Sequence, residues 1–394
     1  MSAPGGDAAG RRPGRRIGRR ALLAGGIGLG GAGLVARAAA PVPASGQGQP
    51  PAGTESAPTQ ALQRRVYNTT PLLAGAPVNE LEGIITPNRV HFVRNHFNVP
   101  QIDAATWTLT VTGAVRTPRT FTLDELKALP SRSLICYIEC SGNGRRFYRP
   151  QASGTQWGND AISVAEWTGV PLRDLLDLVG LSEQAVDIVA EGADAGRVYR
   201  AIPRVKALDP DTLVAYLQNG EALTRENGYP VRLVVPGWGG ISSIKWLVRL
   251  EAHETPFLGY YNHRTYVYET PGLPKTPVQA LGVKSFIARP ADGSTVPAGR
   301  PLVVQGYAWS GWAQIRRVEV SANGGPWQEA QLLEPVLRWA WVRWRLELPA
   351  PAAGTLALRS RATDAGGNVQ PETVAWNRYG YGNNAIQTVT VQVS

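Results

Sequence analysis

The chain has 394 residues, of which 44 are Gly and 31 are Pro, a content that argues against a helical bundle or coiled coil and favours loops, turns and short strands. Of its 40 Lys and Arg and its 30 Asp and Glu, seven Arg and one acid lie in residues 1–40, which leaves 33 basic and 29 acidic residues beyond them. This near balance does not indicate DNA or RNA binding, and the length is sufficient for about two to three domains.

The first 62 residues are predicted to be an export signal and a linker rather than part of the fold. A basic stretch, RRPGRRIGRR, precedes an apolar, Gly-rich run of about 15 residues and an Ala-rich ending, the pattern of a signal peptide. Arg19–Arg20 before Ala-Leu-Leu resembles the twin-arginine signal, with an ordinary Sec signal as the alternative. We therefore expect a twin-arginine signal peptide over 1–40, a disordered Pro/Gly/Ser-rich linker over 41–62, and a periplasmic or otherwise extracytoplasmic protein without a membrane span in its mature part.

Residues 63–282 mix strand patterns with helix patterns. Strands are predicted over 106–113, where polar and apolar residues alternate, over 131–140 and over 231–236, and helices after Thr122 and at Pro171. The two kinds of element interleave without the regular repeat of a doubly wound sheet, which favours an α+β domain.

Residues 283–394 carry only strand patterns. The predicted strands cover 301–307, 315–321, 341–348, 356–363 and 387–393, with Asn-Gly-Gly and Asp-Ala-Gly-Gly turns between them. Short strands at this spacing are typical of an immunoglobulin-like β-sandwich of about 110 residues. Such domains often provide assembly surfaces rather than catalytic residues, so we expect a two-domain division of labour.

The two cysteines, Cys136 and Cys140, lie four residues apart in one predicted strand. In a strand their Cα atoms are roughly 13 Å apart, beyond the ~7 Å that a disulfide allows, whereas a helix would bring them close enough. We therefore expect no disulfide, and we expect Cys136 to be a small buried apolar residue. The chain has no Cys-x-x-Cys-His motif and no cysteine cluster, which argues against c-type haem and iron–sulfur centres.

Cys140 differs because a Gly-containing turn, Ser-Gly-Asn-Gly-Arg145-Arg146, follows it. A thiol at the end of a strand is exposed on a rigid support, and nearby cations favour the thiolate that acts as a nucleophile or metal ligand. The same residues also fit an ordinary turn with solvated arginines. The residues alone leave both interpretations open.

Cys140 and the turn after it form one of four blocks of sequence that together resemble a known family, and this resemblance runs from about residue 88 to 394. The blocks are RNHFNVP (94–100), CSGNGR (140–145), NGE with NGYPVR, PG and IKW (219–246), and RATD with NVQP, WN and NA (361–385). In this order and spacing they resemble the sulfite oxidase family of molybdenum enzymes. The resemblance implies a molybdopterin-binding catalytic domain over 63–282 and an immunoglobulin-like dimerisation domain over 283–394, and hence a homodimer.

The resemblance also implies a set of site residues. Cys140 would bind molybdenum, while the pterin dithiolene supplies further sulfur ligands. The residues expected to hold the cofactor are Asn95, His96, Cys140, Ser141, Asn227, Arg232, Ser243 and Lys245. Those expected to frame a pocket for a sulfur oxyanion are Arg94, Arg145, Trp157 and Tyr266, with Tyr261 as the rival of Tyr266. Arginine suits an oxyanion because its planar fork of donors never loses its charge.

Two departures from the family pattern surround the substrate pocket. Asn227 stands where the family commonly has His, and Tyr379 stands where the family pattern places a substrate arginine of the second domain. Asn can still form hydrogen bonds but cannot carry charge. The cofactor is therefore better supported than the substrate.

The activity that the resemblance implies is oxidation of sulfite to sulfate by oxo transfer, with a molybdenum–molybdopterin (Mo-MPT) cofactor. Because the chain has no haem motif, the electrons would pass to an external cytochrome c or a similar carrier. One alternative is the molybdenum subunit of a sulfane dehydrogenase acting on carrier-bound sulfur, which the CSGNG block and Asn227 favour, and another is sulfoxide reduction. The alternative outside this class is an exported binding protein without a cofactor.

Overall fold

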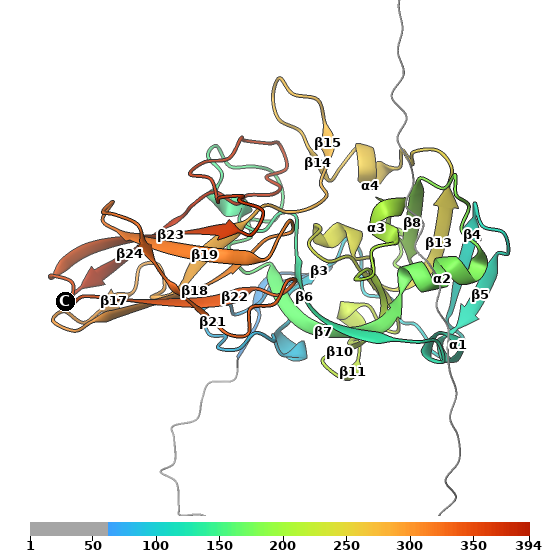
Figure 1. Ribbon diagram of the computed structural model, residues 1–394, viewed down its shortest axis with the longest axis horizontal. Helices are drawn as coiled ribbons and strands as arrows, with labels where there is room; N and C mark the ends of the chain where they lie inside the picture. The colour runs from blue at the N-terminus through green and yellow to red at the C-terminus, as the bar shows by residue number, and fades with distance from the viewer. Residues whose placement is uncertain (1–61) are drawn as a thin grey trace, which may run out of the picture. The chain divides into compact units, whose positions relative to one another are not determined.

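The computed structural model describes residues 62–394, so the predicted signal peptide and all but the last residue of the predicted linker lie outside the described residues. Strands make up most of the described elements, and the helices are few and short (Figure 1). The described residues belong to one compact unit. No helix in this part of the chain is long and apolar enough to cross a membrane.

The sheet whose strand β6 ends next to Cys140 is antiparallel. Its strands run in the order β11-β10-β7-β6, and β12 pairs with β10. The bounds are β6 Arg132–Glu139, β7 Ile162–Pro171, β10 Leu213–Gln218, β11 Glu221–Ala222 and β12 Arg232–Val234. β6 confirms the strand predicted over 131–140 and ends one residue before Cys140. Because every residue of β6 pairs with β7, the direction in which the chain leaves the sheet at Cys140 is well defined.

A second sheet, in the order β5-β4-β13-β8-β9, shares an apolar core with the first. Its strands are β4 Thr108–Gly113, β5 Arg119–Thr122, β8 Asp187–Gly192, β9 Tyr199–Pro203 and β13 Leu247–His253, and the accompanying helices are α1 Leu123–Lys127, α2 Leu172–Val179, α3 Arg204–Ala207 and α4 Tyr260–His263. The predicted helices are confirmed as α1 and α2. The hydroxyl of Thr122 accepts from Glu125 N and the Glu125 carboxylate accepts from Thr122 N, a reciprocal cap that begins α1.

Shorter elements position the loops around the first two sheets. They are the three-stranded sheet of β1 Arg65–Thr69, β2 Leu72–Gly75 and β3 Val93–Arg94, the hairpin of β14 Val267–Tyr268 and β15 Thr276–Pro277, and 3₁₀ turns at Asn88–Val90, Arg145–Phe147, Arg225–Asn227 and Gly240–Ser242. None of these elements was predicted, because segments of five residues or fewer are too short to show a hydrophobic period.

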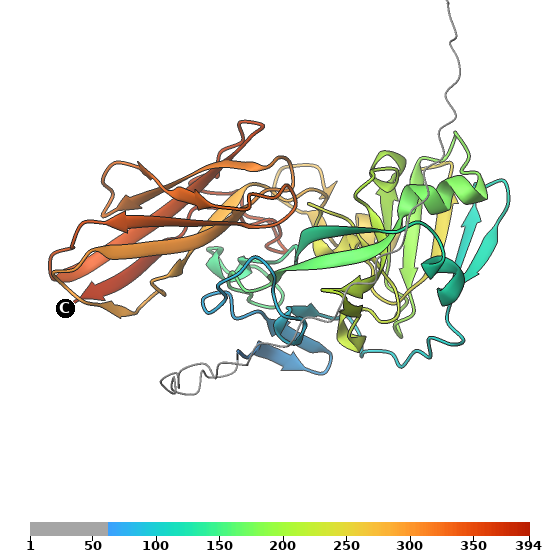
Figure 2. The same cartoon turned by 60° about the horizontal axis from the view of Figure 1, so that its bottom comes forward.

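The predicted immunoglobulin-like sandwich is confirmed in the C-terminal part of the chain (Figures 1 and 2). One sheet has the order β16-β18-β22-β21 and the other β17-β24-β23-β19-β20. The bounds are β16 Lys284–Arg289, β17 Thr295–Val296, β18 Leu302–Trp309, β19 Ile315–Ala322, β20 Gln328–Glu329, β21 Gln331–Leu333, β22 Val342–Leu348, β23 Gly354–Asp364 and β24 Thr388–Val393. All five predicted strands are present, whereas the predicted domain boundaries stay predictions.

β16 was missed because it does not alternate between buried and exposed residues. Five of its six residues are buried. Phe286 packs into the apolar core that also contains residues of β6, and the next residue, Ile287, packs into the core of the sandwich. A strand buried on both faces lacks the period of two that identifies a half-exposed strand.

Candidate active site

Cys140 lies in a tight turn directly after β6. Its N–H donates to Ala161 O at 2.9 Å, and its carbonyl accepts from Asn143 N at 2.8 Å. Gly144 closes the turn in a left-handed conformation, φ +85°, which glycine adopts without strain. Both cysteines are free thiols. Cys136 is fully buried and burial raises its pKa, which makes it unreactive, whereas Cys140 reaches a cavity.

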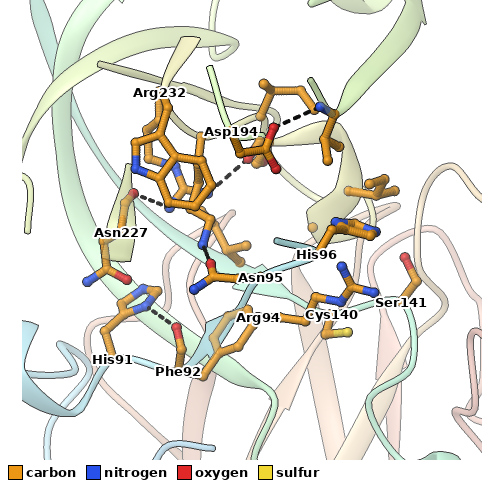
Figure 3. A pocket seen from close by; sticks show the side chains of 18 of the residues that line it. His91, Phe92, Arg94, Asn95, His96, Cys140, Ser141, Asp194, Asn227 and Arg232 are labelled. Carbon is orange, nitrogen blue, oxygen red and sulfur yellow. Dashed lines mark hydrogen bonds between the residues drawn. The ribbon is translucent and has the colours of Figure 1, made fainter. Parts of the chain in front are cut away.

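The cavity beside Cys140 has a volume of about 700 Å³, part of it open to solvent. Ten of the twelve predicted site residues line it: Arg94, Asn95, His96, Cys140, Ser141, Asn227, Arg232, Ser243, Lys245 and Tyr266. Figure 3 labels seven of them, together with His91, Phe92 and Asp194, and shows their side chains around a common space. The ten residues come from the end of β3 and the loop after it, from the turn after β6, from β12 and the loops on either side of it, and from the segment before β14, so only the fold brings them together.

The cavity is electropositive. Arg94, Arg232 and Lys245 line it, and Asp194 is the one acid among its lining residues. Burial lowers the pKa of Arg232 to about 9. Burial, together with the charges of Arg232 and Arg94, holds the pKa of Lys245 well below its ordinary value. Clustered cations that lose hydration in this way stabilise an anionic ligand.

Hydrogen bonds to main-chain carbonyls hold Arg232 in place. Its Nη1 donates to Asn227 O at 2.9 Å and its Nη2 donates to Ser243 O at 3.0 Å. The guanidinium also lies 4.9 Å from the centroid of the Trp167 ring. Two of its three nitrogens are thus bonded to the protein, whereas its Nε has no hydrogen-bond partner among residues 62–394.

Several buried polar atoms around the cavity have no hydrogen-bond partner among residues 62–394. They are His91 Nε2, Arg94 Nη1, Asn95 Nδ2, Ser141 Oγ, Asn227 Nδ2 and Arg232 Nε. Leaving such an atom unpaired costs about 1–3 kcal/mol. A ligand rich in hydrogen-bond acceptors would satisfy most of them at once, so this set fits a polar, anionic group.

His96 and Tyr266 form a hydrogen-bonded pair on the cavity wall. The Tyr266 hydroxyl lies 2.9 Å from His96 Nε2. Burial, helped by the charges of Arg94 and Lys245, lowers the pKa of His96 to about 2, and burial raises the pKa of Tyr266. The imidazole is therefore neutral and accepts at Nε2 from the protonated phenol. Tyr261 does not line the cavity and packs edge-on against His96 at 5.2 Å.

Arg145 and Trp157 are the two predicted site residues that do not line this cavity. Arg145 donates from Nε to Tyr379 O at 2.7 Å and from Nη1 to Thr155 O at 2.8 Å. Trp157 is only 1% exposed, and its ring packs against Tyr67 at 4.5 Å. Their direct contact with an oxyanion stays a prediction.

Asp194, His91 and Trp246 line the cavity although none was predicted. Asp194 follows β8, where its Oδ1 accepts from Val198 N at 2.8 Å and burial raises its pKa. Signals existed for the other two, because Trp246 belongs to the IKW block and His91 lies just before the RNHFNVP block. An Asp after a strand is common in ordinary turns, so Asp194 had no distinguishing signal.

Comparisons with known proteins match two segments of the chain, one that contains Cys140 and one that contains the sandwich. Residues 96–261 match the family model described as the oxidoreductase molybdopterin binding domain, and residues 275–394 match the Mo-co oxidoreductase dimerisation domain. Human mitochondrial sulfite oxidase is 38% identical over 359 residues, covering 84% of this chain and 66% of that protein. The NADH nitrate reductase of Solanum lycopersicum is 34% identical over 374 residues, covering 84% of this chain and 41% of that protein.

Among solved structures, the sulfane dehydrogenase SoxCD from Paracoccus pantotrophus matches with a TM-score of 0.77 at 31% identity, covering 87% of this chain and 92% of that chain. This chain therefore spans nearly all of the matched SoxCD chain, just under two thirds of the human sulfite oxidase and well under half of the nitrate reductase. The first matched domain contains Cys140, Arg232 and Lys245.

Proposed function

This chain belongs to the sulfite oxidase family of molybdopterin oxidoreductases, and we propose that it oxidises sulfite to sulfate and passes the electrons to an external carrier such as a cytochrome c. The observation that carries the proposal is the Cys140 thiol, which meets an electropositive cavity lined by unpartnered polar atoms. A soft thiolate suits molybdenum, and guanidinium groups suit an oxyanion.

The lining residues fit a Mo-MPT cofactor. Cys140 would provide a thiolate ligand to the metal. The residues that would bind the pterin and its phosphate through atoms without a partner are Asn95, Ser141, Asn227 and Arg232. Asp194 could accept from the N–H groups of the pterin ring. When bound, the cofactor supplies a metal centre that takes up two electrons and exchanges an oxygen atom with the substrate, while the protein supplies binding, orientation and electrostatics.

Arg94 is the side chain best placed to bind the sulfur oxyanion. Its guanidinium lies 6.0 Å from the centroid of the Tyr266 ring, and its Nη1 has no partner among residues 62–394. A planar guanidinium fork matches the geometry of an oxyanion. Tyr266 keeps its proton at the phenol oxygen and shares it with neutral His96. The substrate would therefore meet the Arg94 guanidinium beside the phenol of Tyr266.

The second candidate is oxidation of carrier-bound sulfur, as a sulfane dehydrogenase performs it. Two observations favour it: the likeness to SoxCD extends over 92% of that chain, and Arg145 has two of its nitrogens bonded to main-chain carbonyls. Because these two nitrogens of Arg145 are bonded to the protein, they are not free to donate to a doubly charged anion such as sulfite. A less charged sulfur centre would need fewer such donors.

Steady-state kinetics of the purified holoenzyme separates the two candidates. We expect turnover of sulfite with a soluble cytochrome c, in proportion to a molybdenum content near one per chain. Turnover of thiosulfate without turnover of sulfite would favour the second candidate, and turnover of a sulfoxide with a reductant would indicate reverse oxo transfer. A chain without molybdenum, made in a host with an active cofactor pathway, would contradict both and favour a binding protein.

We also propose export by the twin-arginine route, on the basis of residues 1–40. Replacing Arg19 and Arg20 by Lys keeps the charge but removes the guanidinium pair, so we expect the protein to stay in the cytoplasm of a bacterial host. The same exchange at Arg15 and Arg16 is the matched control and should leave export unchanged. Cell fractionation and immunoblotting measure both. Equal export of the two double variants would rule out the twin-arginine route.

A homodimer is the third part of the proposal, supported by the match of residues 275–394 to the dimerisation domain. Trp309, Trp341 and Trp344 are buried in the protein, whereas Trp312 is 61% exposed on the sandwich and is the candidate interface anchor. Light scattering should give twice the mass of one chain. The mass of a single chain would contradict the dimer.

A further inference from the structure

A loop of the C-terminal region, residues 377–383, packs against the turn that follows β6. The backbone N–H of Gly382 donates to Ser141 O at 2.8 Å. Asn383 Nδ2 donates to Gly144 O at 3.0 Å, across 239 positions of sequence. The C-terminal region therefore reaches the backbone on the C-terminal side of the proposed metal ligand.

Tyr381 is held firmly within this loop. Its N–H donates to Asn377 Oδ1 at 2.9 Å, and its carbonyl accepts from Asn377 Nδ2 at 3.0 Å and from the Tyr148 hydroxyl at 3.1 Å. Gly380 and Gly382, on either side, have φ of +57° and +64°, and a Cβ at either position would lie within 3 Å of a neighbouring side chain. Only glycine allows this close approach, so the loop presents the Tyr381 ring in one orientation.

The Tyr381 ring packs against two predicted site residues. It stacks on the Tyr266 ring at 5.1 Å between centroids with an interplanar angle of 10°. The guanidinium carbon of Arg145 lies 5.4 Å from the centroid of the Tyr381 ring. Tyr266 has φ +54°, a left-handed conformation that costs a bulky residue free energy. The orientation of Tyr266 therefore depends on the packing around its ring.

We infer that Tyr381 is a positioning residue of the active site: its ring, stacked on Tyr266, fixes the orientation of the Tyr266 phenol on the cavity wall. Aromatic pairs of this geometry contribute about 0.5–1.5 kcal/mol beyond the area they bury. A displacement of about 1 Å in a substrate-binding group lowers the rate by up to ~100-fold. The inference rests on the proposed function only for the measurements that use sulfite as the substrate.

Two variants of Tyr381 test the inference in the holoenzyme. Tyr381→Leu removes the flat ring, whereas Tyr381→Phe keeps the ring and removes only the hydroxyl. For Tyr381→Leu we expect the KM for sulfite and the Kd for sulfate, measured calorimetrically, to rise about tenfold, with a smaller loss in kcat. We also expect a changed Mo(V) electron paramagnetic resonance spectrum after partial reduction with dithionite. Tyr381→Phe should keep wild-type values. Trp327→Leu, which changes an aromatic of the same domain that packs against Arg361 outside the cavity, should keep them too.

The inference would be overturned if Tyr381→Leu, at full molybdenum content, had the same KM, Kd and spectrum as the wild-type protein. Should that variant fail to fold or to load molybdenum, Tyr381→Met, which nearly keeps the volume but has no ring, carries the same three measurements. A wild-type protein that holds molybdenum but does not oxidise sulfite refutes the proposed function alone. The spectral comparison needs no substrate, so it still decides the role of Tyr381 in that case.

Discussion

Cys140→Ser is expected to abolish turnover while leaving the fold nearly unchanged. A hydroxyl is a poor ligand for a metal that prefers thiolates. Mutating a residue that only hydrogen-bonds to a metal ligand lowers metal affinity or activity roughly 10- to 100-fold, and loss of the ligand itself should lower them further. The fold should survive because the backbone bonds of residue 140, to Ala161 and Asn143, do not involve the sulfur. Metal analysis, kcat with sulfite and thermal denaturation are the measurements.

Cys136→Ser is the matched control for this experiment. The same atom changes four residues earlier, within β6, but Cys136 is fully buried away from the cavity, and its thiol donates to Tyr137 O. A serine can keep that bond, so we expect normal molybdenum content and kcat with a modest loss of stability. Turnover that survives Cys140→Ser, or disappears only in Cys136→Ser, would show that Cys140 is not the ligand.

Lys284→Met is expected to cause the largest loss of stability. Lys284 lies in β16, is 2% exposed, and its Nζ is 4.0 Å from Oε1 of Glu139, the residue before Cys140. Burial raises the pKa of Glu139 and lowers that of Lys284, so each depends on the other to remain charged. Removing one partner of a buried pair costs about 3–5 kcal/mol. Chemical denaturation of the variant should show a decrease of this size in the free energy of unfolding.

Glu139 is also held by two neutral donors, which makes a double-variant test informative. Asn143 Nδ2 donates to its Oε1 at 2.9 Å, and Trp309 Nε1 donates to its Oε2 at 2.7 Å. In Glu139→Gln with Lys284→Met neither member of the pair carries a charge, but the new amide nitrogen cannot accept from the second donor. We therefore expect part of the stability to return. Arg119→Met, which breaks an exposed pair with Glu125, is the control and should cost less than about 1 kcal/mol. A loss no larger for Lys284→Met than for Arg119→Met would contradict the prediction.

Local sequence patterns were sufficient for several of the longer elements. The alternation over 106–113, the cap at Thr122 and the strands of the sandwich were all predicted, because each depends on residues a few positions apart. The blocks around Arg94 and Cys140 were identified by their resemblance to the family motifs, and the structure places both where a strand ends.

The role of each side chain within the site was much less predictable. Arg145 was expected to face an oxyanion, yet its Nε donates to Tyr379 O, 234 positions away. Asp194 carried no signal of its own, and it enters the site because the turn after β8 meets the cavity near Lys245. Such placements depend on how separate segments pack, which no local period records.

The amino-acid sequence alone indicated the family, five strands of the sandwich, a few strands and two helices of the first domain, and, through the resemblance, Cys140 as the candidate metal ligand. These follow from short motifs and from the spacing of apolar residues. Only the tertiary structure decided which polar atoms around the cavity stay without partners, and that Lys284 and Tyr381 of the C-terminal region support the turn and the tyrosine beside it. The physical reason is that hydrogen bonding, burial and stacking depend on segments that are more than a hundred residues apart and meet only when the chain is folded.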